Sequence, residues 1–97
     1  MKEVYIHGEK GGKHYYLELP NNFKSFNQPG LSRDKAVYFA ATKALSEIEG
    51  DIRIHSSDLS FIQQVSGWRK SKKKELQKLG TILWKLSKWR LVRWCYI

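Results

Sequence analysis

Residues 51–67 constrain the fold of this chain more than any other segment, because they combine a short strand, a turn and a short helix. Isoleucine alternates with polar residues over 51–56, which predicts a strand that buries one face. Asp58 follows at the carboxyl end of that strand, as the expected N-cap of a helix over 59–65. Because open α/β sheets place their chemistry at the carboxyl ends of strands, Asp58 is also a candidate functional residue.

Six further elements are predicted on either side of this segment. Alternation of apolar and polar residues predicts strands over 2–7, 14–19, 23–27 and 90–97. Apolar residues at helical spacing predict helices over 33–48 and 71–88. Because three strands come first and helical crossovers lead to the last two, we expect an antiparallel meander joined to parallel pairs. The prediction is one domain over residues 1–97, an α/β fold with a mixed five-stranded sheet.

The composition excludes several classes of protein. Hydrophobic residues make up 41% of the 97 residues and aromatic residues 13%, which indicates a folded globule. No apolar run approaches the ~18 residues that span a bilayer, and the first residues include no apolar stretch of signal-peptide type. The single cysteine, Cys95, excludes an internal disulfide framework and a multi-cysteine zinc site. We therefore expect a cytoplasmic protein with no membrane partner.

The net charge of +9 is concentrated in the last third of the chain. Residues 1–66 carry eight Lys or Arg and eight Asp or Glu, which sum to zero. Residues 67–97 carry ten Lys or Arg against Glu75 alone, which leaves +9. A scattered charge would indicate only a solvated surface, whereas this concentration is typical of proteins that bind nucleic acid.

Four segments carry local patterns of a known family. VYIHG at 4–8, FAATKALSEI at 39–48, SDLSFIQQVSG at 57–67 and WCYI at 94–97 resemble segments of ribonuclease H-like domains. They resemble, in that order, the first strand, the first helix, the turn from the fourth strand into the second helix, and the fifth strand. The resemblance covers essentially the whole chain. It implies the element order βββαβααβ and the sheet order 3-2-1-4-5, truncated after the fifth strand and so lacking the final helix of the family.

The same resemblance implies a degenerate catalytic site. Family enzymes hold two magnesium ions with four carboxylates. His7 stands at the first carboxylate position and Val37 at the second, Asp58 matches the third, and the fourth would lie beyond the last residue. Asp34, one turn before Val37, is the other candidate catalytic residue. His7 has a simpler interpretation, because a lone histidine is more often a structural or surface residue. We therefore expect no cofactor. Magnesium or manganese would be held, by Asp58 and His7, only in a divergent nuclease.

The basic segment after the second helix is the strongest candidate for binding. Lysine and arginine neutralise phosphates, and an exposed tryptophan stacks on a base or sugar. Several family members carry a similar segment that grips the substrate backbone. A solvated helix start is the alternative, but lysines at a helix N-terminus oppose the helix dipole, which favours a functional role. The candidate nucleic-acid-binding residues are Trp68, Arg69, Lys70, Lys72, Lys73, Lys74 and Lys78.

The remaining tryptophans, Trp84, Trp89 and Trp94, fit core or dimer packing better than a binding role. Without a final helix, Leu91, Trp94 and Tyr96 are expected near an exposed edge strand and an apolar patch. This favours a homodimer through the C-terminal strand.

These features predict a non-catalytic ribonuclease H-like domain that contacts the phosphate backbone of nucleic acid through its basic last third. The target is expected to be a duplex, by family analogy an RNA–DNA hybrid, bound without sequence preference because phosphate contacts carry no base information. The sequence leaves three alternatives open. They are a divergent metal-dependent ribonuclease, a dimeric protein-interaction module with an acidic partner, and a truncated gene product without activity of its own.

Overall fold

The computed structural model describes residues 1–67 and 71–97, which form five strands and three helices. In chain order these are β1 (Lys2–Gly8), β2 (Lys13–Glu18), β3 (Asn22–Asn27), α1 (Arg33–Glu47), β4 (Ile52–Ser56), α2 (Leu59–Val65), α3 (Lys74–Ser87) and β5 (Val92–Tyr96). The predicted order is confirmed, with shifted ends. The helix expected from residue 71 begins at Lys74, because Ser71 Oγ accepts the Lys73 backbone N–H (3.2 Å) in a turn ahead of the helix.

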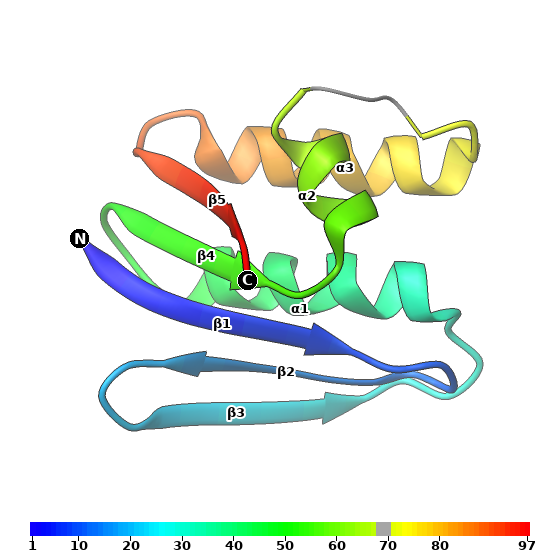
Figure 1. The fold of residues 1–97 in the computed structure, drawn as a ribbon, viewed down its shortest axis with the longest axis horizontal. Coiled ribbons are helices and arrows are strands. Elements are labelled where there is room, and N and C mark those ends of the chain that lie inside the picture. Colours follow the sequence, from blue (N-terminus) through cyan, green and yellow to red (C-terminus); the bar gives the residue numbers. More distant parts are fainter. Residues whose placement is uncertain (68–70) are drawn as a thin grey trace.

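The five strands form one mixed sheet in the order β3-β2-β1-β4-β5 (Figure 1). β1 pairs antiparallel with β2, and β2 pairs antiparallel with β3. β4 pairs in parallel with both β1 and β5, with Val4 opposite Ile54 and Ile54 opposite Trp94. The predicted meander and parallel crossovers are therefore confirmed. The carboxyl ends of β1, β4 and β5 meet at one edge of the sheet, and Asp58 follows β4 at that edge.

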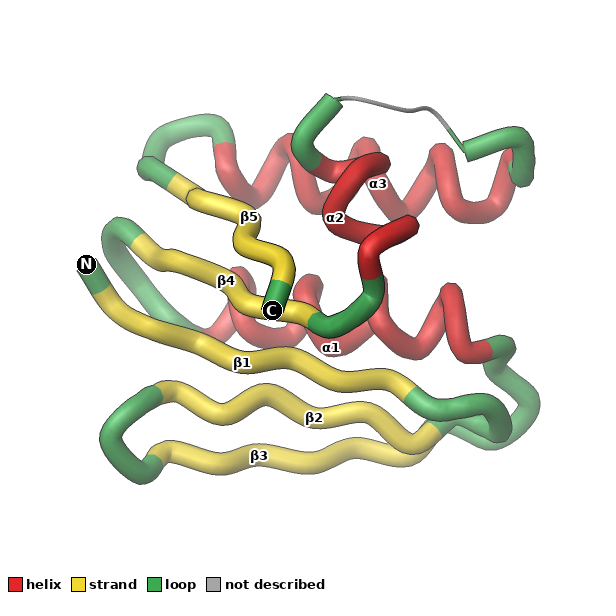
Figure 2. Tube along the Cα trace, viewed as in Figure 1, coloured by secondary structure: helices red, strands yellow, loops and turns green. Residues whose placement is uncertain are grey.

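One face of the sheet is buried against α1, which lies behind the strands in Figure 2. Val4, Ile6 and Ile54 point to this face and are at most 4% exposed. α1 crosses β1 closely at Gly8, where a Cβ atom would lie 2.4 Å from the backbone nitrogen of Val37. A side chain at position 8 would therefore push the helix off the strand, which explains a glycine at the end of β1.

α3 packs alongside α1, whereas α2 contacts β4, β5 and α1 (Figure 1). Leu76 and Leu83 of α3 are buried, and Leu79 and Leu86 pack against the core, as their helical spacing predicted. The main packing partner of α3 is therefore α1. None of the helices in the described ranges is long and apolar enough to cross a membrane.

The other face of the sheet carries half-exposed polar and aromatic side chains. Tyr5 of β1 stacks on His55 of β4, with ring centroids 4.5 Å apart and ring planes 15° apart. Glu3 lies 2.9 Å from His55 Nε2 and 3.2 Å from Arg53 Nη1. The hydrogen bond from His55, more than the charge of Arg53, holds the pKa of Glu3 below its usual range. These contacts join β1 to β4 on the face away from α1.

Candidate nucleic-acid interface

The two candidate catalytic carboxylates, Asp34 and Asp58, line one small hollow at the N-terminal ends of α1 and α2. Tyr38 and Gln64 line the same hollow, where the Tyr38 hydroxyl donates a hydrogen bond to Gln64 Oε1 (2.6 Å). Burial, followed by the negative charges of Asp34 and Asp58, raises the pKa of Tyr38 to about 12. The fold therefore brings together two carboxylates that lie far apart in the sequence.

Asp58 caps α2, as its position after the strand predicted. Its Oδ1 atom accepts a hydrogen bond from the backbone N–H of Phe61 (3.1 Å). Its own backbone N–H donates to Ser56 Oγ (3.1 Å), which fixes the turn between β4 and α2. The structural role of this carboxylate is thus explained by the helix it begins.

Two ion pairs join the N-terminal turns of α1 and α3. Lys73 Nζ lies 3.2 Å from Asp34 Oδ2. Lys35 Nζ lies 2.6 Å from Glu75 Oε2, and Lys35 is the largest cause that holds the pKa of Glu75 below its usual range. A lysine predicted to bind phosphate is therefore already paired with a carboxylate predicted to be catalytic.

The donors around the hollow do not fit a two-metal centre. His7 lies 3.5 Å from Glu9 Oε1 and lines a separate cavity with Tyr15, while Val37 is buried in the core. Within residues 1–67 and 71–97 there is no group of three or more His, Cys, Asp or Glu side chains that could hold a metal ion. The described residues thus do not assemble the carboxylate set that two-metal phosphodiester chemistry uses.

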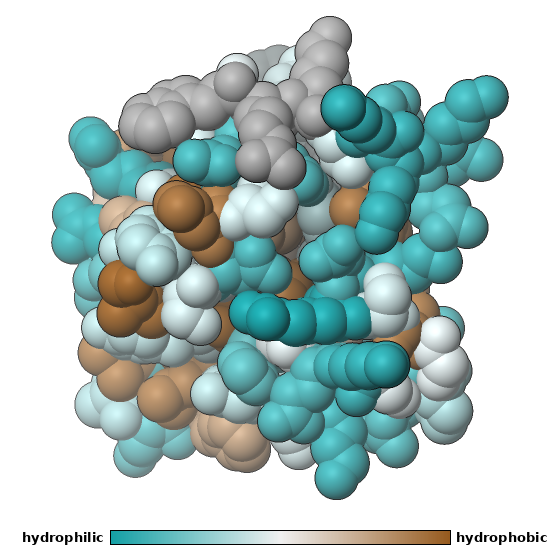
Figure 3. Space-filling model, turned by 45° about the vertical axis from the view of Figure 1, so that its right-hand side comes forward, coloured by the Kyte–Doolittle hydropathy of each residue, from teal (hydrophilic) through white to brown (hydrophobic). Residues whose placement is uncertain are grey.

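The basic surface of the site lies at the N-terminal end of α3. Lys72, Lys74 and Lys78 are exposed, and none of the three forms an ion pair within the described part of the chain. α3 also begins without a side-chain cap, because its N-cap residue is Lys73. Hydrophilic side chains dominate much of the face in Figure 3, on which this end of the molecule comes forward. Three predicted binding residues lie outside the described residues: Trp68, Arg69 and Lys70.

Arg90 has a structural role that the sequence did not predict. Its Nε donates to Gly50 O (2.6 Å) and its Nη1 to Leu45 O (2.8 Å), while Nη2 donates to Ile48 O. The guanidinium thus satisfies backbone carbonyls at the C-terminal end of α1. This contact also explains why the last strand begins at Val92 and not at the expected residue 90. No sequence signal pairs an arginine with a helix end forty residues earlier.

Two of the tryptophans assigned by sequence to core or dimer packing are exposed in this chain. Trp84 is 64% exposed and Trp89 is 89% exposed, so neither contributes to the core. Trp94 does pack against the core, edge-on to Phe61 with ring centroids 5.6 Å apart. The spacing of the tryptophans in the sequence could not show which of them are exposed, because the side of α3 that faces solvent depends on where α1 packs.

Comparison with known proteins gives the fold. No family model matches this chain, and no curated protein sequence matches it. Among solved structures, the crystal structure of LC11-RNase H1 in complex with an RNA/DNA hybrid is similar, with a TM-score of 0.89 and 14% sequence identity. The similarity covers 100% of this chain and 85% of that chain. The chain therefore has a ribonuclease H-like fold, with the five-stranded mixed sheet in the predicted order 3-2-1-4-5.

Proposed function

We propose that this protein is a non-catalytic nucleic-acid-binding domain that contacts the phosphate backbone through the N-terminal end of α3. One observation carries the proposal: Lys72, Lys74 and Lys78 are exposed at a helix N-terminus whose N-cap residue, Lys73, makes no capping hydrogen bond with its side chain. Lysines and uncapped N–H groups at a helix N-terminus both bind phosphate oxygens. The same basic segment supplies the further proposed contacts Trp68, Arg69, Lys70 and Lys73.

The proposed target is a nucleic-acid duplex, with an RNA/DNA hybrid preferred. The solved structure with the same fold, LC11-RNase H1, is in complex with an RNA/DNA hybrid, which supports this choice. Since lysine contacts with phosphates carry no base information, the proposed binding is independent of sequence. We further propose that the protein is cytoplasmic and that it needs neither a cofactor nor a membrane partner.

The proposal of a non-catalytic domain rests on the donor set around the hollow. Asp34 is paired with Lys73 and Asp58 caps a helix, while Val37, which the resemblance places at the second carboxylate position, is buried in the core. The alternative is a divergent nuclease in which Asp58, Asp34 and His7 use magnesium or manganese. Because Asp34 and Asp58 line the same hollow, a nuclease is favoured over other enzyme activities as the alternative. Metal-dependent cleavage that Asp58→Asn abolishes would support it.

The decisive experiment measures binding to labelled hybrid, duplex DNA, duplex RNA and single strands over about 50 to 200 mM salt, with magnesium present. The test variant combines Lys72→Ala with Lys74→Ala. The matched control combines Lys10→Ala with Lys13→Ala, which removes the same charge at an exposed residue of the turn after β1 and at the exposed first residue of β2. Because each phosphate contact releases counterions, we expect a steep salt dependence in the wild type and in the control.

We expect the test variant to bind duplexes about tenfold more weakly and with a shallower salt slope. Equal loss in both double variants would indicate net charge alone and reject the proposed surface. Weak binding of the wild type to every substrate, with no dependence on salt, would reject nucleic-acid binding altogether. It would favour a protein-interaction module instead.

A homodimer through β5 is a further part of the proposal. β5 is an edge strand of the sheet, and Leu91, Tyr96 and Ile97 around it are between 47% and 61% exposed. An unpaired strand edge with apolar side chains is a ready surface for a second copy. Sedimentation velocity over a concentration series should show a dimer that Tyr96→Lys disrupts, whereas Leu19→Lys on a distant turn should leave it intact. A monomer at every concentration would reject the dimer.

A further inference from the structure

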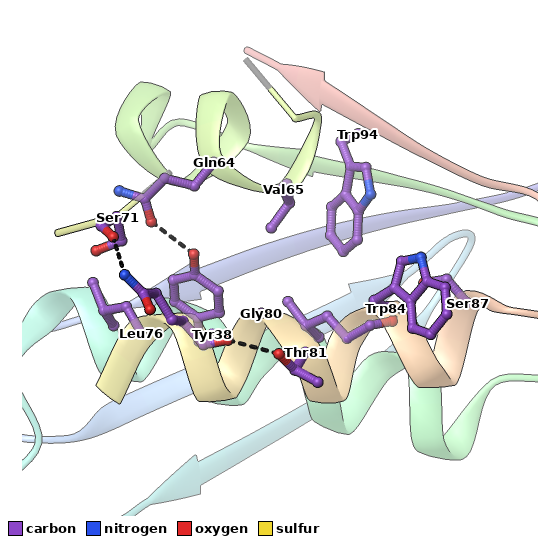
Figure 4. A pocket seen from close by; sticks show the side chains of 12 residues that line it. Tyr38, Gln64, Val65, Ser71, Leu76, Gly80, Thr81, Trp84, Ser87 and Trp94 are labelled. Atoms are coloured by element: carbon purple, nitrogen blue, oxygen red, sulfur yellow. Dashed lines mark hydrogen bonds between the residues drawn. The ribbon is translucent and has the colours of Figure 1, made fainter. Parts of the chain in front are cut away.

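A cleft of ≈ 450 Å³ opens between α2, α3 and β5 (Figure 4). Trp94 reaches it from β5 and Trp84 from α3, so two indole rings line it from different elements. Buried Leu76 and Leu83 belong to its apolar floor. The cleft exists because α3 packs on α1 and leaves a space toward α2 and β5. Its volume falls within the ~300–1,000 Å³ typical of pockets that hold small organic ligands.

The rim of the cleft is polar along one stripe of α3. Gln77, Thr81 and Trp84 follow one another at helical spacing and line the opening. The Thr81 hydroxyl donates to Gln77 O (3.0 Å), and the Ser87 hydroxyl donates to Leu83 O (2.7 Å). Each hydroxyl oxygen therefore keeps lone pairs that can accept a hydrogen bond from a ligand. The cleft thus combines aromatic walls with hydrogen-bonding edges.

A lysine lies between two exposed indole rings, one of which, that of Trp84, lines the cleft. Lys88 Nζ lies 5.9 Å from the ring centroid of Trp84 and 5.4 Å from that of Trp89. Both rings are mostly exposed, at 64% and 89%, so their faces can take a planar partner from solvent. A cation beside exposed aromatic faces is complementary to a ligand that is both anionic and planar.

We infer that this cleft binds an unpaired base of a single-stranded nucleic-acid segment, with Trp84 stacking on the base and Lys88 contacting the adjacent phosphate. A base offers the flat ring that indole faces stack on, and its polar edge can pair with the hydroxyls of the rim. An acyl chain offers no flat ring that could stack on the indole faces. The inference rests on the proposed nucleic-acid binding and adds a second, single-strand site to it.

The test compares short oligothymidylate with an abasic strand of the same length and charge, because only the first can stack. Fluorescence anisotropy of the labelled strands gives the affinities. We expect the wild type to prefer the base-bearing strand by about tenfold or more, the range that stacking of one base supplies. Trp84→Ala should remove this preference, and Trp84→Phe should restore part of it. Ile82→Ala, an exposed residue of α3 outside the cleft lining, is the matched control.

The outcomes separate this inference from the proposed function. Equal affinity for both strands, with salt-dependent duplex binding retained, would overturn the single-strand site and leave the duplex surface standing. A preference that survives Trp84→Ala would also overturn it. No binding to any strand or duplex would overturn both. Binding of anionic phosphatidylserine vesicles in place of strands would assign the exposed tryptophans to a lipid surface and reject the inference.

Discussion

Lys73 Nζ and Asp34 Oδ2 lie 3.2 Å apart, so the ion pair between α1 and α3 joins the basic surface to the acidic hollow. Both side chains remain substantially exposed, at 67% and 45%. In the proposed complex, an incoming phosphate would therefore compete with the Asp34 carboxylate for Lys73. The affinity for the proposed nucleic-acid ligand should for this reason depend on the charge of Asp34.

Asp34→Asn should strengthen nucleic-acid binding by about two- to fivefold at low salt, because it releases Lys73 and removes a nearby negative charge. Stability should change by less than about 1 kcal/mol, since an exposed ion pair contributes little. Binding titrations beside Glu49→Gln, which changes net charge equally at the far end of α1, check the effect. Weaker binding in Asp34→Asn than in this control would contradict the proposed competition.

Asp58→Ala should destabilise the fold by about 1 kcal/mol, because the N–H of Phe61 loses its capping acceptor. Asp58→Asn should cost much less, since an asparagine oxygen caps a helix nearly as well. Urea unfolding of the two variants measures the difference. Equal destabilisation by both would show that the negative charge, and not the cap, matters at this position.

Arg90→Ala should lower the free energy of unfolding by about 2 kcal/mol, because carbonyls at the end of α1 lose charged hydrogen-bond donors. For a domain of this size the melting temperature should fall by roughly 10 °C. Arg93→Ala is the matched control, since it removes the same charge from an exposed position three residues later. Similar melting of both variants would disprove the capping role of Arg90.

The decrease in the free energy of unfolding at acid pH should depend on Tyr16. Its hydroxyl donates to Glu47 Oε1 (2.6 Å), and this bond, ahead of Lys24, holds the pKa of Glu47 below its usual range. A lowered folded-state pKa gives stability that is present above the unfolded value of about 4.3 and is lost as pH falls through the folded value. The stability gap between wild type and Tyr16→Phe should therefore be largest near neutral pH and shrink on acidification.

Urea titrations at a series of pH values measure this gap. Tyr15→Phe serves as the control, because Tyr15 points to the opposite face of the sheet and is only half-buried. A gap that stays constant from about pH 7 to about pH 3 would show that Tyr16 acts through packing alone.

Most of the fold could be predicted from the sequence because local periodicity encodes it. Alternation in β1 and β4 marks which side chains turn inward, and the leucine spacing of α3 marks its buried stripe. The crossover rules then leave few sheet orders, and the observed one is the order that the family resemblance implied. The cap at Asp58 was also predictable, because a cap depends only on residues next to it in the chain.

The pairing of side chains across the molecule could not be predicted in this way. Lys73 meets Asp34, and Arg90 meets the end of α1, only because α3 and the segment after it pack against that helix. The charge count from the sequence treats all ten basic residues of the last third alike. In the structure, Arg90 is hydrogen-bonded to the end of α1 and Lys73 forms an ion pair with Asp34. Which charges face solvent is a property of packing.

The sequence by itself determined the element order and the concentration of charge, since each follows from short-range periodicity and composition, while the sheet order was implied by the family resemblance. Only the tertiary structure decided that Trp84 and Trp89 are mostly exposed while Trp94 packs against the core. The physical reason is that periodicity names the inward stripe of an element, but the neighbour that covers its remaining sides is chosen by long-range packing. The cleft between α2, α3 and β5 exists because no described neighbour fills that space.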